Sequence, residues 1–389
     1  MEIKQQLFGL MAALGRKVYR IAGYHYLAEE NEVLARQFSL GIKDQECLLT
    51  RQQLKAYQQR WKVLGKDIRN IHVNNAYCFR GVFDIDIVPS NIYYSAIEPA
   101  LNNRTFGISY EDKARIDWIN GETNVPHIFV RNINGVYYDA SQKEVFRSNI
   151  DLNDLVKNKK AVVVKKTIES HGGKGVIIFD RDMEGILRNA EGDILTLDYL
   201  EKLYEQDFLI QEFVEQHPFY NQFNPSSLNT FRVVTYRSVL DNKIHVLYTF
   251  LRVGAPGSRI DNVSKGGLFL CLKEDGCFVD FGLRKGGEKV FKLDGFPPFA
   301  EMDRVYMIDE VWQLAKEIAA RHVYSRLLAF DMTVDKNGKI LHIETNTSDI
   351  GMEGIQYTIG PIFRRFTNEV INYCQEKLKK VSLYKLHAS

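Results

Sequence analysis

The stretch that decides the fold is residues 327–346, LLAFDMTVDKNGKILHIETN. Two segments of alternating apolar and polar residues flank Asn337 and Gly338, a dipeptide typical of a two-residue type I′ hairpin turn. Such a turn predicts an antiparallel hairpin in which Asp331 faces Glu344. The apolar side, which we expect to pack on a core, consists of Phe330, Met332, Val334, Leu341 and Ile343, with Val334 opposite Leu341. The polar side consists of Asp331, Thr333, His342, Glu344 and Asn346.

The polar side of this hairpin places two carboxylates opposite each other. Directly opposed like charges destabilise a sheet, and neither Asp331 nor Glu344 has a lysine or arginine on its own strand. A divalent cation between them would remove the repulsion, because Mg²⁺ binds one or two carboxylates together with substrate phosphates. Asn346 adds an amide oxygen to the same side. The alternative is a solvated polar face of an antiparallel sheet.

A glycine-rich loop lies between two apolar segments at residues 162–179, VVVKKTIESHGGKGVIIF. Glycines let backbone N–H groups approach phosphate oxygens, and a lysine adds a positive charge. The Walker pattern GxxxxGK[ST] is absent, so a plain hairpin turn remains the alternative. Lys165 ends the first apolar segment, where burial of its charge requires an anionic partner. Residues 208–218, FLIQEFVEQHP, predict a strand that ends in a polar hinge, whose backbone could contact an adenine edge.

The remainder of the chain predicts a helical N-terminal part followed by alternating strands and helices. Residues 1–80 contain little glycine or proline, and residues 51–69 carry apolar side chains at helical spacing. The segment FDIDIVP at residues 83–89 alternates like a strand. Further strands are expected at residues 161–165, 229–239 and 243–253, and helices at residues 308–321 and 363–380.

Composition excludes several classes of protein. The 51 Lys+Arg nearly balance the 49 Asp+Glu, and the net charge of +2 argues against a general nucleic-acid binder. No apolar run approaches the about 20 residues of a membrane span. The best candidate, residues 7–14, reads as an amphipathic surface helix, and weak membrane association stays open. The five cysteines are odd in number and irregularly spaced, so we expect free thiols in a reducing cytoplasm.

Taken together, these motifs resemble the ATP-grasp superfamily, and most closely its sugar-transfer-associated branch. The resemblance covers roughly residues 105–375 and rests on YEDK at 110–113, the glycine loop, IQEFVEQHP, LNTFRVVTYR, RVGAPGSRIDNVSKGG and the carboxylate hairpin. It implies an α+β fold, an ATP-grasp fold that holds a nucleotide between two α+β subdomains, with a helical N-terminal region. The implied division is residues 1–105 for the helical region, 106–213 for the small or lid subdomain, and 214–389 for the large subdomain with the Mg²⁺ site.

The resemblance also implies roles for individual residues. Lys113 and Lys165 would bind ATP phosphates, and the glycine loop would close over the β- and γ-phosphates. The polar hinge would hold adenine, with His217 or Glu215 near the ribose. The positions implied for ATP binding are Lys113, Lys165, His171, Gly172, Gly173, Lys174, Gln211, Glu212, Phe213, His217 and Lys265. The positions implied for Mg²⁺ are Asp331, Glu344 and Asn346, since an Asp followed by Glu-x-Asn is the family's magnesium signature.

Three more positions resemble those that hold the transferring phosphate and the acyl intermediate in related ligases, namely Arg232, Arg252 and Asn262. If residues 241 and 242 formed a simple two-residue turn, Arg232 would face Leu251, and the two arginines would point to opposite faces of the sheet. Either a β-bulge restores a common face, or only one arginine acts at the site. Lys166 departs from the family pattern, because many members have proline there.

The implied reaction is an ATP- and Mg²⁺-dependent ligation. A substrate carboxylate attacks the γ-phosphate to give an acyl phosphate and ADP, and an amine or other nucleophile then displaces phosphate. The branch implies a sugar acid or amino acid used in surface-polysaccharide synthesis. Two alternatives stay open, a kinase on the same scaffold and an ATP-binding regulatory protein without turnover. We expect small-molecule substrates, no nucleic acid and a cytoplasmic location, and we leave a homodimer open.

Overall fold

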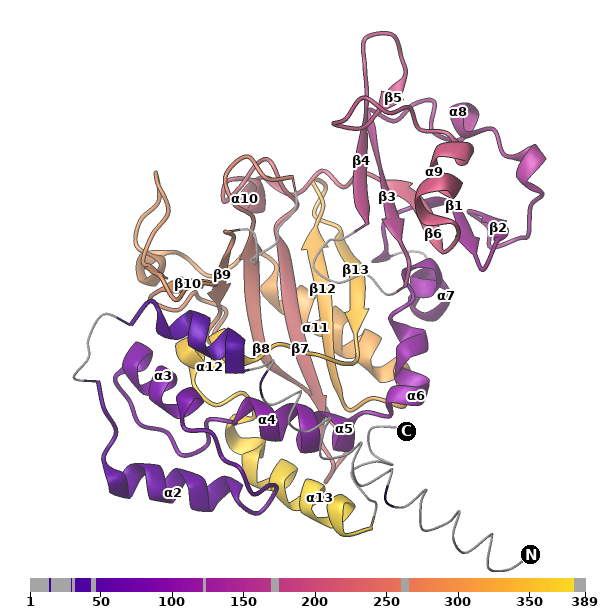
Figure 1. The fold of residues 1–389 in the computed structure, drawn as a ribbon. Helices are drawn as coiled ribbons and strands as arrows, with labels where there is room; N and C mark the ends of the chain where they lie inside the picture. The colour runs from indigo at the N-terminus through magenta and orange to yellow at the C-terminus, as the bar shows by residue number, and fades with distance from the viewer. Residues whose placement is uncertain are drawn as a thin grey trace, which may run out of the picture.

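The computed structural model describes Leu14, Glu29 and residues 32–42, 47–121, 124–168, 175–259 and 266–380. In these residues the strands form two antiparallel sheets, a large one at the centre of Figure 1 and a small one at its upper right. The N-terminal helices and the C-terminal helix α13 lie over the large sheet (Figure 1). None of the described helices is long and apolar enough to cross a membrane.

The large sheet has its strands in the order β11-β10-β9-β8-β7-β12-β13. These strands are β7 (Thr230–Arg237), β8 (Ile244–Val253), β9 (Leu268–Cys271), β10 (Gly282–Arg284), β11 (Lys289–Val290), β12 (Leu327–Val334) and β13 (Ile340–Asn346). Every residue of β12 is buried, because the strand lies between β7 and β13 and is covered on both faces. The hairpin partner β13 forms the edge of the sheet on the side of the small sheet (Figure 1).

Helices cover both faces of the large sheet and form a separate core on each. On one face, α11 (Ile308–Arg321) packs Val311, Ala315 and Ile318 against Phe330 of β12. Its bounds are those expected from the apolar spacing. The other face is covered by α2 (Arg51–Trp61), α3 (Ile71–Arg80), α4 (Ser90–Ile92), the π-helical turn at Tyr93–Ile97, α5 (Glu98–Leu101), α12 (Glu353–Ile359) and α13 (Thr367–Lys380). The N-terminal helices thus share one core with the large sheet.

The small sheet has the strand order β2-β1-β6-β3-β4-β5 and a core of its own. Its strands are β1 (Ile128–Ile133), β2 (Val136–Asp139), β3 (Ala161–Lys166), β4 (Val176–Arg181), β5 (Leu187–Arg188) and β6 (Phe208–Glu212). The helices α8 (Leu152–Leu155) and α9 (Leu197–Tyr204) contribute Leu152, Leu197 and Leu200 to its core. Between the two sheets run α6 (Arg104–Gly107), the 3₁₀ turns at Ile108–Tyr110 and Lys113–Arg115, and α7 (Ile116–Asn120), while α10 (Pro218–Asn221) follows β6.

The turn of the β12–β13 hairpin differs from the expected one. The amide of Asp335 donates to the carbonyl of Lys339 at 2.8 Å, so the turn has three residues instead of two. Gly338 takes φ +83°, a conformation that favours glycine at the end of such a turn. The longer turn shifts the register by one residue, and Val334 therefore pairs with Ile340 instead of Leu341.

A bulge then reverses that shift further along the same hairpin. The register changes between Asp331 and Met332, and Asp331 lies directly opposite Glu344, as expected. Between the turn and the bulge the expected pairing is wrong, because Met332 pairs with His342. His342 consequently lies on the core face, where it is fully buried, and not on the polar side. The two irregularities cancel at the pair of carboxylates.

A bulge also settles the arrangement of the two arginines on β7 and β8. Arg232 lies opposite Phe250, not opposite Leu251 as a simple two-residue turn would require. Arg252 lies opposite Thr230, two residues further along the ladder. Because side chains two positions apart share a face, Arg232 and Arg252 point to the same side of the sheet.

Two expectations for the N-terminal part are wrong. The helix expected over residues 51–69 ends at Trp61, and the segment FDIDIVP forms no strand. The amide of Asp86 bonds to the side chain of Asp84 at 3.0 Å, and the amide of Val88 bonds to the side chain of Gln356 at 2.7 Å. Side-chain oxygens thus replace the partner strand that the alternating pattern would need. Of residues 7–14, only Leu14 belongs to the described part of the chain.

The expectation that all five cysteines are free thiols is also wrong. Cys47 and Cys78 form a disulfide, with their Cα atoms 5.4 Å apart and a sequence separation of 31. The bond joins the segment before α2 to α3, and irregular spacing gave no sign of it. Cys271, Cys277 and Cys374 are free.

Candidate active site

Asp331 on β12 binds two arginines that come from neighbouring strands. Arg232, directly opposite on β7, donates Nε to Oδ1 at 2.8 Å and Nη2 to Oδ2 at 2.9 Å. Arg252 on β8 donates Nη2 to Oδ2 at 2.7 Å and also to Thr230 Oγ1 at 2.7 Å. The Asp331 side chain is 2% exposed, whereas those of Arg232 and Arg252 are 17% and 20% exposed. One buried carboxylate therefore holds two guanidinium groups that reach the surface of the sheet.

The charges of this group reinforce one another. Burial alone would raise the pKa of Asp331, but the adjacent guanidinium groups of Arg232 and Arg252 outweigh it and hold that pKa below its usual range. Burial likewise works against the charge of Arg232, and Asp331 more than restores it, so the pKa of Arg232 is raised. Asp331 is therefore ionised at neutral pH, and its single negative charge lies between two arginines.

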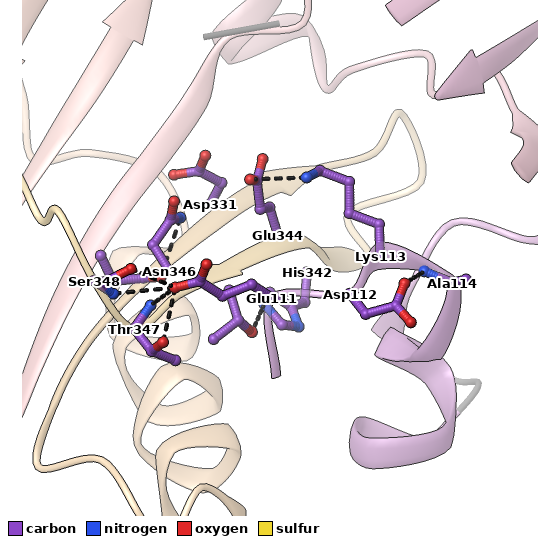
Figure 2. A network of polar contacts seen from close by, with 12 residues as sticks. Glu111, Asp112, Lys113, Ala114, Asp331, His342, Glu344, Asn346, Thr347 and Ser348 are labelled. Carbon is purple, nitrogen blue, oxygen red and sulfur yellow. Dashed lines mark hydrogen bonds and ion pairs between the residues drawn. The ribbon is translucent and has the colours of Figure 1, made fainter. Parts of the chain in front are cut away.

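Glu344 continues the charged group on the edge strand β13 (Figure 2). It lies directly opposite Asp331, and its Oε1 atom is 3.1 Å from Lys113 Nζ. The amide of Lys113 donates to the carbonyl of Thr167, just beyond β3, so this lysine lies between the small sheet and the large one. The cations beside the two carboxylates come from other elements of the fold, which the residues of the two strands could not reveal.

The three residues predicted to hold Mg²⁺ lie together on β12 and β13, and both carboxylate oxygens of Asp331 accept hydrogen bonds from arginines. Asp331 and Glu344 face each other, and Asn346 on the same strand donates its amide to Ala329 O at 3.5 Å. Among the described residues no three His, Cys, Asp or Glu side chains form a metal-binding cluster. Two carboxylates and an amide oxygen suit Mg²⁺, which takes its remaining ligands from phosphate and water. The three assignments remain predictions.

The loop after β13 is held by a glutamate that the sequence patterns did not single out. Glu111 Oε1 accepts hydrogen bonds from the amide and the hydroxyl of Thr347, both at 2.7 Å (Figure 2). The same atom accepts from the amide of Ser348 at 3.1 Å and from its hydroxyl at 3.2 Å. Glu111 belongs to the YEDK motif, and Lys113, two residues later in the same motif, contacts Glu344. This motif thus connects the charged group to the loop that follows it.

A second glutamate, from α5, holds the next part of that loop. Glu98 is fully buried and accepts from the amides of Asp349 at 3.2 Å and Ile350 at 3.0 Å. With Glu111, it satisfies four consecutive backbone N–H groups. Nothing in the local sequence could reveal this contact, since Glu98 lies about 250 residues before its partners. The N-terminal helices thereby fix the backbone next to the carboxylates.

The expected adenine hinge lies at the end of β6, beside β3. Gln211 is buried, and its strand position lies opposite Val163 of β3. Glu212 Oε1 accepts from the amide of His127 at 2.8 Å. Lys165, which is partly exposed, lies opposite Leu209 of β6. Lys165 and the hinge residues therefore occupy adjacent strands of the small sheet, and their roles in ATP binding remain predictions.

Phe213 directly follows β6 and contacts Arg259, which lies in the segment after β8. The guanidinium group of Arg259 lies 5.7 Å from the centre of its ring. Arg259 also forms an ion pair with Asp180 of β4. This exposed pair joins the segment after β8 to the small sheet at the hinge.

The contacts of His217 hold the local fold together. Its ring stacks on Tyr306 at 4.3 Å, and its Nδ1 atom accepts from the amide of Phe219 at 3.2 Å, which caps α10. Glu215 Oε2 is 3.1 Å from Lys336 Nζ. A ribose contact by His217 or Glu215 remains a prediction. Six further predicted residues lie outside the described part of the chain, namely His171, Gly172, Gly173, Lys174, Asn262 and Lys265.

Comparisons with known proteins identify the family to which this chain belongs. A model of the family described as sugar-transfer associated ATP-grasp matches residues 95–371. A search of curated proteins gave no match.

Solved structures with partial similarity include three synthetases and ligases. N5-carboxyaminoimidazole ribonucleotide synthetase from Thermotoga maritima is 14% identical, with a TM-score of 0.37 over 70% of this chain and 52% of that one. D-alanyl-alanine synthetase A from Vibrio cholerae is 12% identical, with a TM-score of 0.37 over 70% of this chain and 66% of that one. L-amino acid ligase from Bacillus licheniformis is 16% identical, with a TM-score of 0.30 over 64% and 42%. The chain thus spans between 42% and 66% of the length of these proteins.

Proposed function

Because the chain belongs to the sugar-transfer-associated ATP-grasp family, we propose that it is an ATP-dependent, ADP-forming ligase. In this proposal it activates a substrate carboxylate as an acyl phosphate and joins it to an amine or another nucleophile. The observation that carries the proposal is the group in which Asp331 binds Arg232 and Arg252 while Glu344 binds Lys113. Three cations concentrated beside two carboxylates form a site for polyphosphate.

The cations have distinct tasks in this mechanism. Lys113 lies between the sheets and would bind a phosphate of ATP in place of Glu344. Arg232 and Arg252 would stabilise the charge that develops when a carboxylate oxygen attacks the γ-phosphorus and ADP leaves. Asp331 keeps both guanidinium groups ionised and oriented before the substrate arrives. The nucleophile then attacks the acyl carbon, and inorganic phosphate and one proton leave.

Mg²⁺ would be held by Asp331, Glu344 and Asn346, and it would neutralise charge on the transferring phosphate. The other predicted groups would bind the nucleotide. Lys165 would contact the phosphate on the adenine side, and the hinge at Gln211 and Glu212 would hold the base. These nucleotide-binding roles are compatible with the pairing of β3, which carries Lys165, with β6, which carries Gln211 and Glu212.

The substrates and the location are further parts of the proposal. We propose that the substrate is a sugar acid or an amino acid used for surface polysaccharide, and that the reaction takes place in the cytoplasm. The Cys47–Cys78 disulfide is a point against a reducing compartment, where disulfides are rare. A homodimer also stays a proposal.

A hydroxylamine trap tests the proposed reaction. The purified protein is incubated with Mg-ATP, pooled sugar acids and amino acids, and hydroxylamine, and the products are identified by mass spectrometry. The proposal predicts ADP together with a hydroxamate, whose mass names the carboxylate. ADP with a stable phosphorylated compound and no hydroxamate would instead establish a kinase. If ATP with Mg²⁺ neither turns over nor raises the melting temperature, the proposal is wrong.

A further inference from the structure

The first half of β8 forms an open sheet edge far from the charged group. Within the described part of the chain, β9 pairs only with residues 250–253 of β8, and Thr249 O accepts from the amide of Leu272. Residues 244–248 therefore have no partner strand on that side. At about 3.3 Å per residue, Val246 lies about 20 Å along the strand from Arg252. A ligand at this edge would not contact the proposed active site.

A groove of about 550 Å³ runs along this edge, and we name it the edge groove. Its floor is the stretch of β8 from Ile244 to Thr249, and its walls come from both sides of the sheet. Trp312 and Lys316 of α11 form one wall, and Arg364, Arg365 and Phe366 form the other. Within the described part of the chain, the groove borders a stretch of β8 that has no partner strand on that side, which is where one more strand could pair.

The walls are held in place by contacts of their own. Trp312 donates its indole N–H to Thr249 Oγ1 at 2.8 Å. The ring of Phe366 packs on Tyr236 at 5.4 Å and on His245 at 4.7 Å. These aromatic side chains fix the width of the groove without an occupant. A preformed groove spares a ligand the cost of ordering it.

The charge of the edge groove selects its occupant. Four cations line it, Lys273, Lys316, Arg364 and Arg365, against a single carboxylate, Glu274. Glu274 is ion-paired with Arg364, and Lys273 is ion-paired with Asp280, so the positive excess of the lining rests on Lys316 and Arg365. A second copy of this chain would bring the same cations to the same edge, and the two grooves would repel each other. The charge instead complements an acidic segment of another protein.

We propose that the edge groove binds an extended acidic peptide of a partner protein, which adds a strand to β8. Main-chain hydrogen bonds to residues 244–248 supply affinity, as in other complexes formed by strand addition. Successive side chains of an added strand point to opposite faces, so acidic residues at neighbouring positions of the peptide contact Lys316 on one wall and Arg365 on the other. The uncovered edge and the positive walls are thus two halves of one recognition surface.

The test uses fluorescein-labelled heptapeptides in which pairs of Glu alternate with pairs of Val, so that Glu lies on both faces of the added strand. Binding is measured by fluorescence anisotropy on the full-length protein at low salt. The Glu/Val peptide is expected to bind, and a Lys/Val peptide of the same length is not. Methylation of alternate backbone nitrogens is expected to weaken binding at least tenfold, because it removes main-chain donors. Hydrogen exchange of residues 244–248 is expected to slow when the Glu/Val peptide is added.

Charge-reversal variants locate the site. Lys316→Glu and Arg365→Glu are each expected to weaken peptide binding at least fivefold, with no change in basal ATP turnover. Lys202→Glu, an exposed lysine on α9 of the small sheet, is the matched control and is expected to bind normally. Two results would overturn the proposal. One is equal binding of the methylated peptide with displacement by tripolyphosphate, which would indicate a site for small anions. The other is no binding of any peptide, which would leave the cations as protection of an exposed edge.

Discussion

Asp117 and Asp331 are both buried aspartates that bind arginine, and the two groups differ in what they leave exposed. Asp117 in α7 accepts Nη1 and Nη2 of Arg131 on β1 at 2.7 and 2.8 Å. Arg131 is fully buried, so this pair neutralises itself inside the protein. Asp331 binds two arginines that remain partly exposed, and this group presents excess positive charge at the surface. We call Asp117 with Arg131 the closed pair, and Asp331 with Arg232 and Arg252 the open group. The closed pair only connects elements of the fold, whereas the open group can also bind an anion.

The closed pair also supports the open group. Arg131 Nη1 donates to the carbonyl of Ala114 at 2.6 Å, and Ala114 directly follows Lys113. Lys113 in turn contacts Glu344 across the space between the sheets. The Asp117–Arg131 pair therefore fixes the short segment that presents this lysine. Four predictions test the difference between the two groups.

The largest expected effect is on turnover in Glu344→Gln. This change removes a charge from the partly exposed side of the open group and leaves the volume of the side chain unchanged. We expect a fall in kcat of at least about 1,000-fold, a loss of about 4 kcal/mol of transition-state stabilisation, with little change in the free energy of unfolding. Initial rates of ADP release measure it, and Asp303→Asn on the surface is the control. Normal turnover in Glu344→Gln would remove Glu344 from the site.

The next effect is on stability in Asp117→Asn. Loss of the carboxylate leaves the guanidinium group of Arg131 buried without a counter-charge, and we expect the free energy of unfolding to fall by about 3–5 kcal/mol. Turnover by the folded protein should fall less than tenfold, because only the support of Lys113 is affected. Urea unfolding and initial rates measure the two quantities. The comparison fails if Asp117→Asn loses turnover as completely as Glu344→Gln.

A smaller effect is expected for Glu111→Gln, which neutralises the acceptor of the loop after β13. Charge-assisted bonds to Thr347 and Ser348 become neutral ones, and we expect a loss of about 1–2 kcal/mol in unfolding free energy. The KM for the acceptor substrate should rise more than the KM for ATP, since the loop lies beside the carboxylates. Steady-state kinetics with each substrate varied in turn measures the split. An equal rise in both would indicate a general loss of structure instead.

The smallest effect is a pH dependence carried by His342, which links the helix of Asp117 to the strand of Glu344. Its Nδ1 atom is 3.1 Å from the side-chain Nδ2 atom of Asn120 in α7. Burial and the nearby His322 lower the pKa of His342 to about 3. The unfolded chain, with a pKa near 6.5, binds a proton that the folded protein does not, so stability falls as the pH drops from about 6.5 toward 3.

We expect His342→Gln to lose this part of the pH dependence. Relative to the variant, the unmodified protein should lose about 1 kcal/mol of unfolding free energy between pH 7 and pH 5.5. Urea unfolding at the two pH values measures the difference. Parallel changes in the two proteins would show that His342 does not supply it.

Prediction from the sequence succeeded where a local pattern reports a local structure. The apolar spacing of residues 308–321 correctly predicted α11, because one apolar stripe suffices to bury a helix on a sheet. The alternating segments and the Asn-Gly dipeptide correctly predicted a hairpin with Asp331 opposite Glu344. The turn itself was wrong, and a bulge that the pattern did not show restored the pair.

Prediction failed where the partner lies far away in the chain. FDIDIVP alternates like a strand, yet its amides bond to side chains of its own segment and of Gln356. Cys47 and Cys78 carry no motif that would pair them. Glu98 and Glu111 could not be connected to the loop after β13, because their partners lie more than 200 residues away.

By itself, the sequence determined the family and the hairpin, and it singled out most of the charged residues that meet around Asp331. Those features depend on local order, which turn signals and apolar periodicity encode. Only the tertiary structure decided which charges meet. Bulges place Arg232 and Arg252 on one face, and the approach of the small sheet brings Lys113 to Glu344. Because a shift of one residue in register reverses the face of every side chain, a charged site is decided only when neighbouring strands have paired.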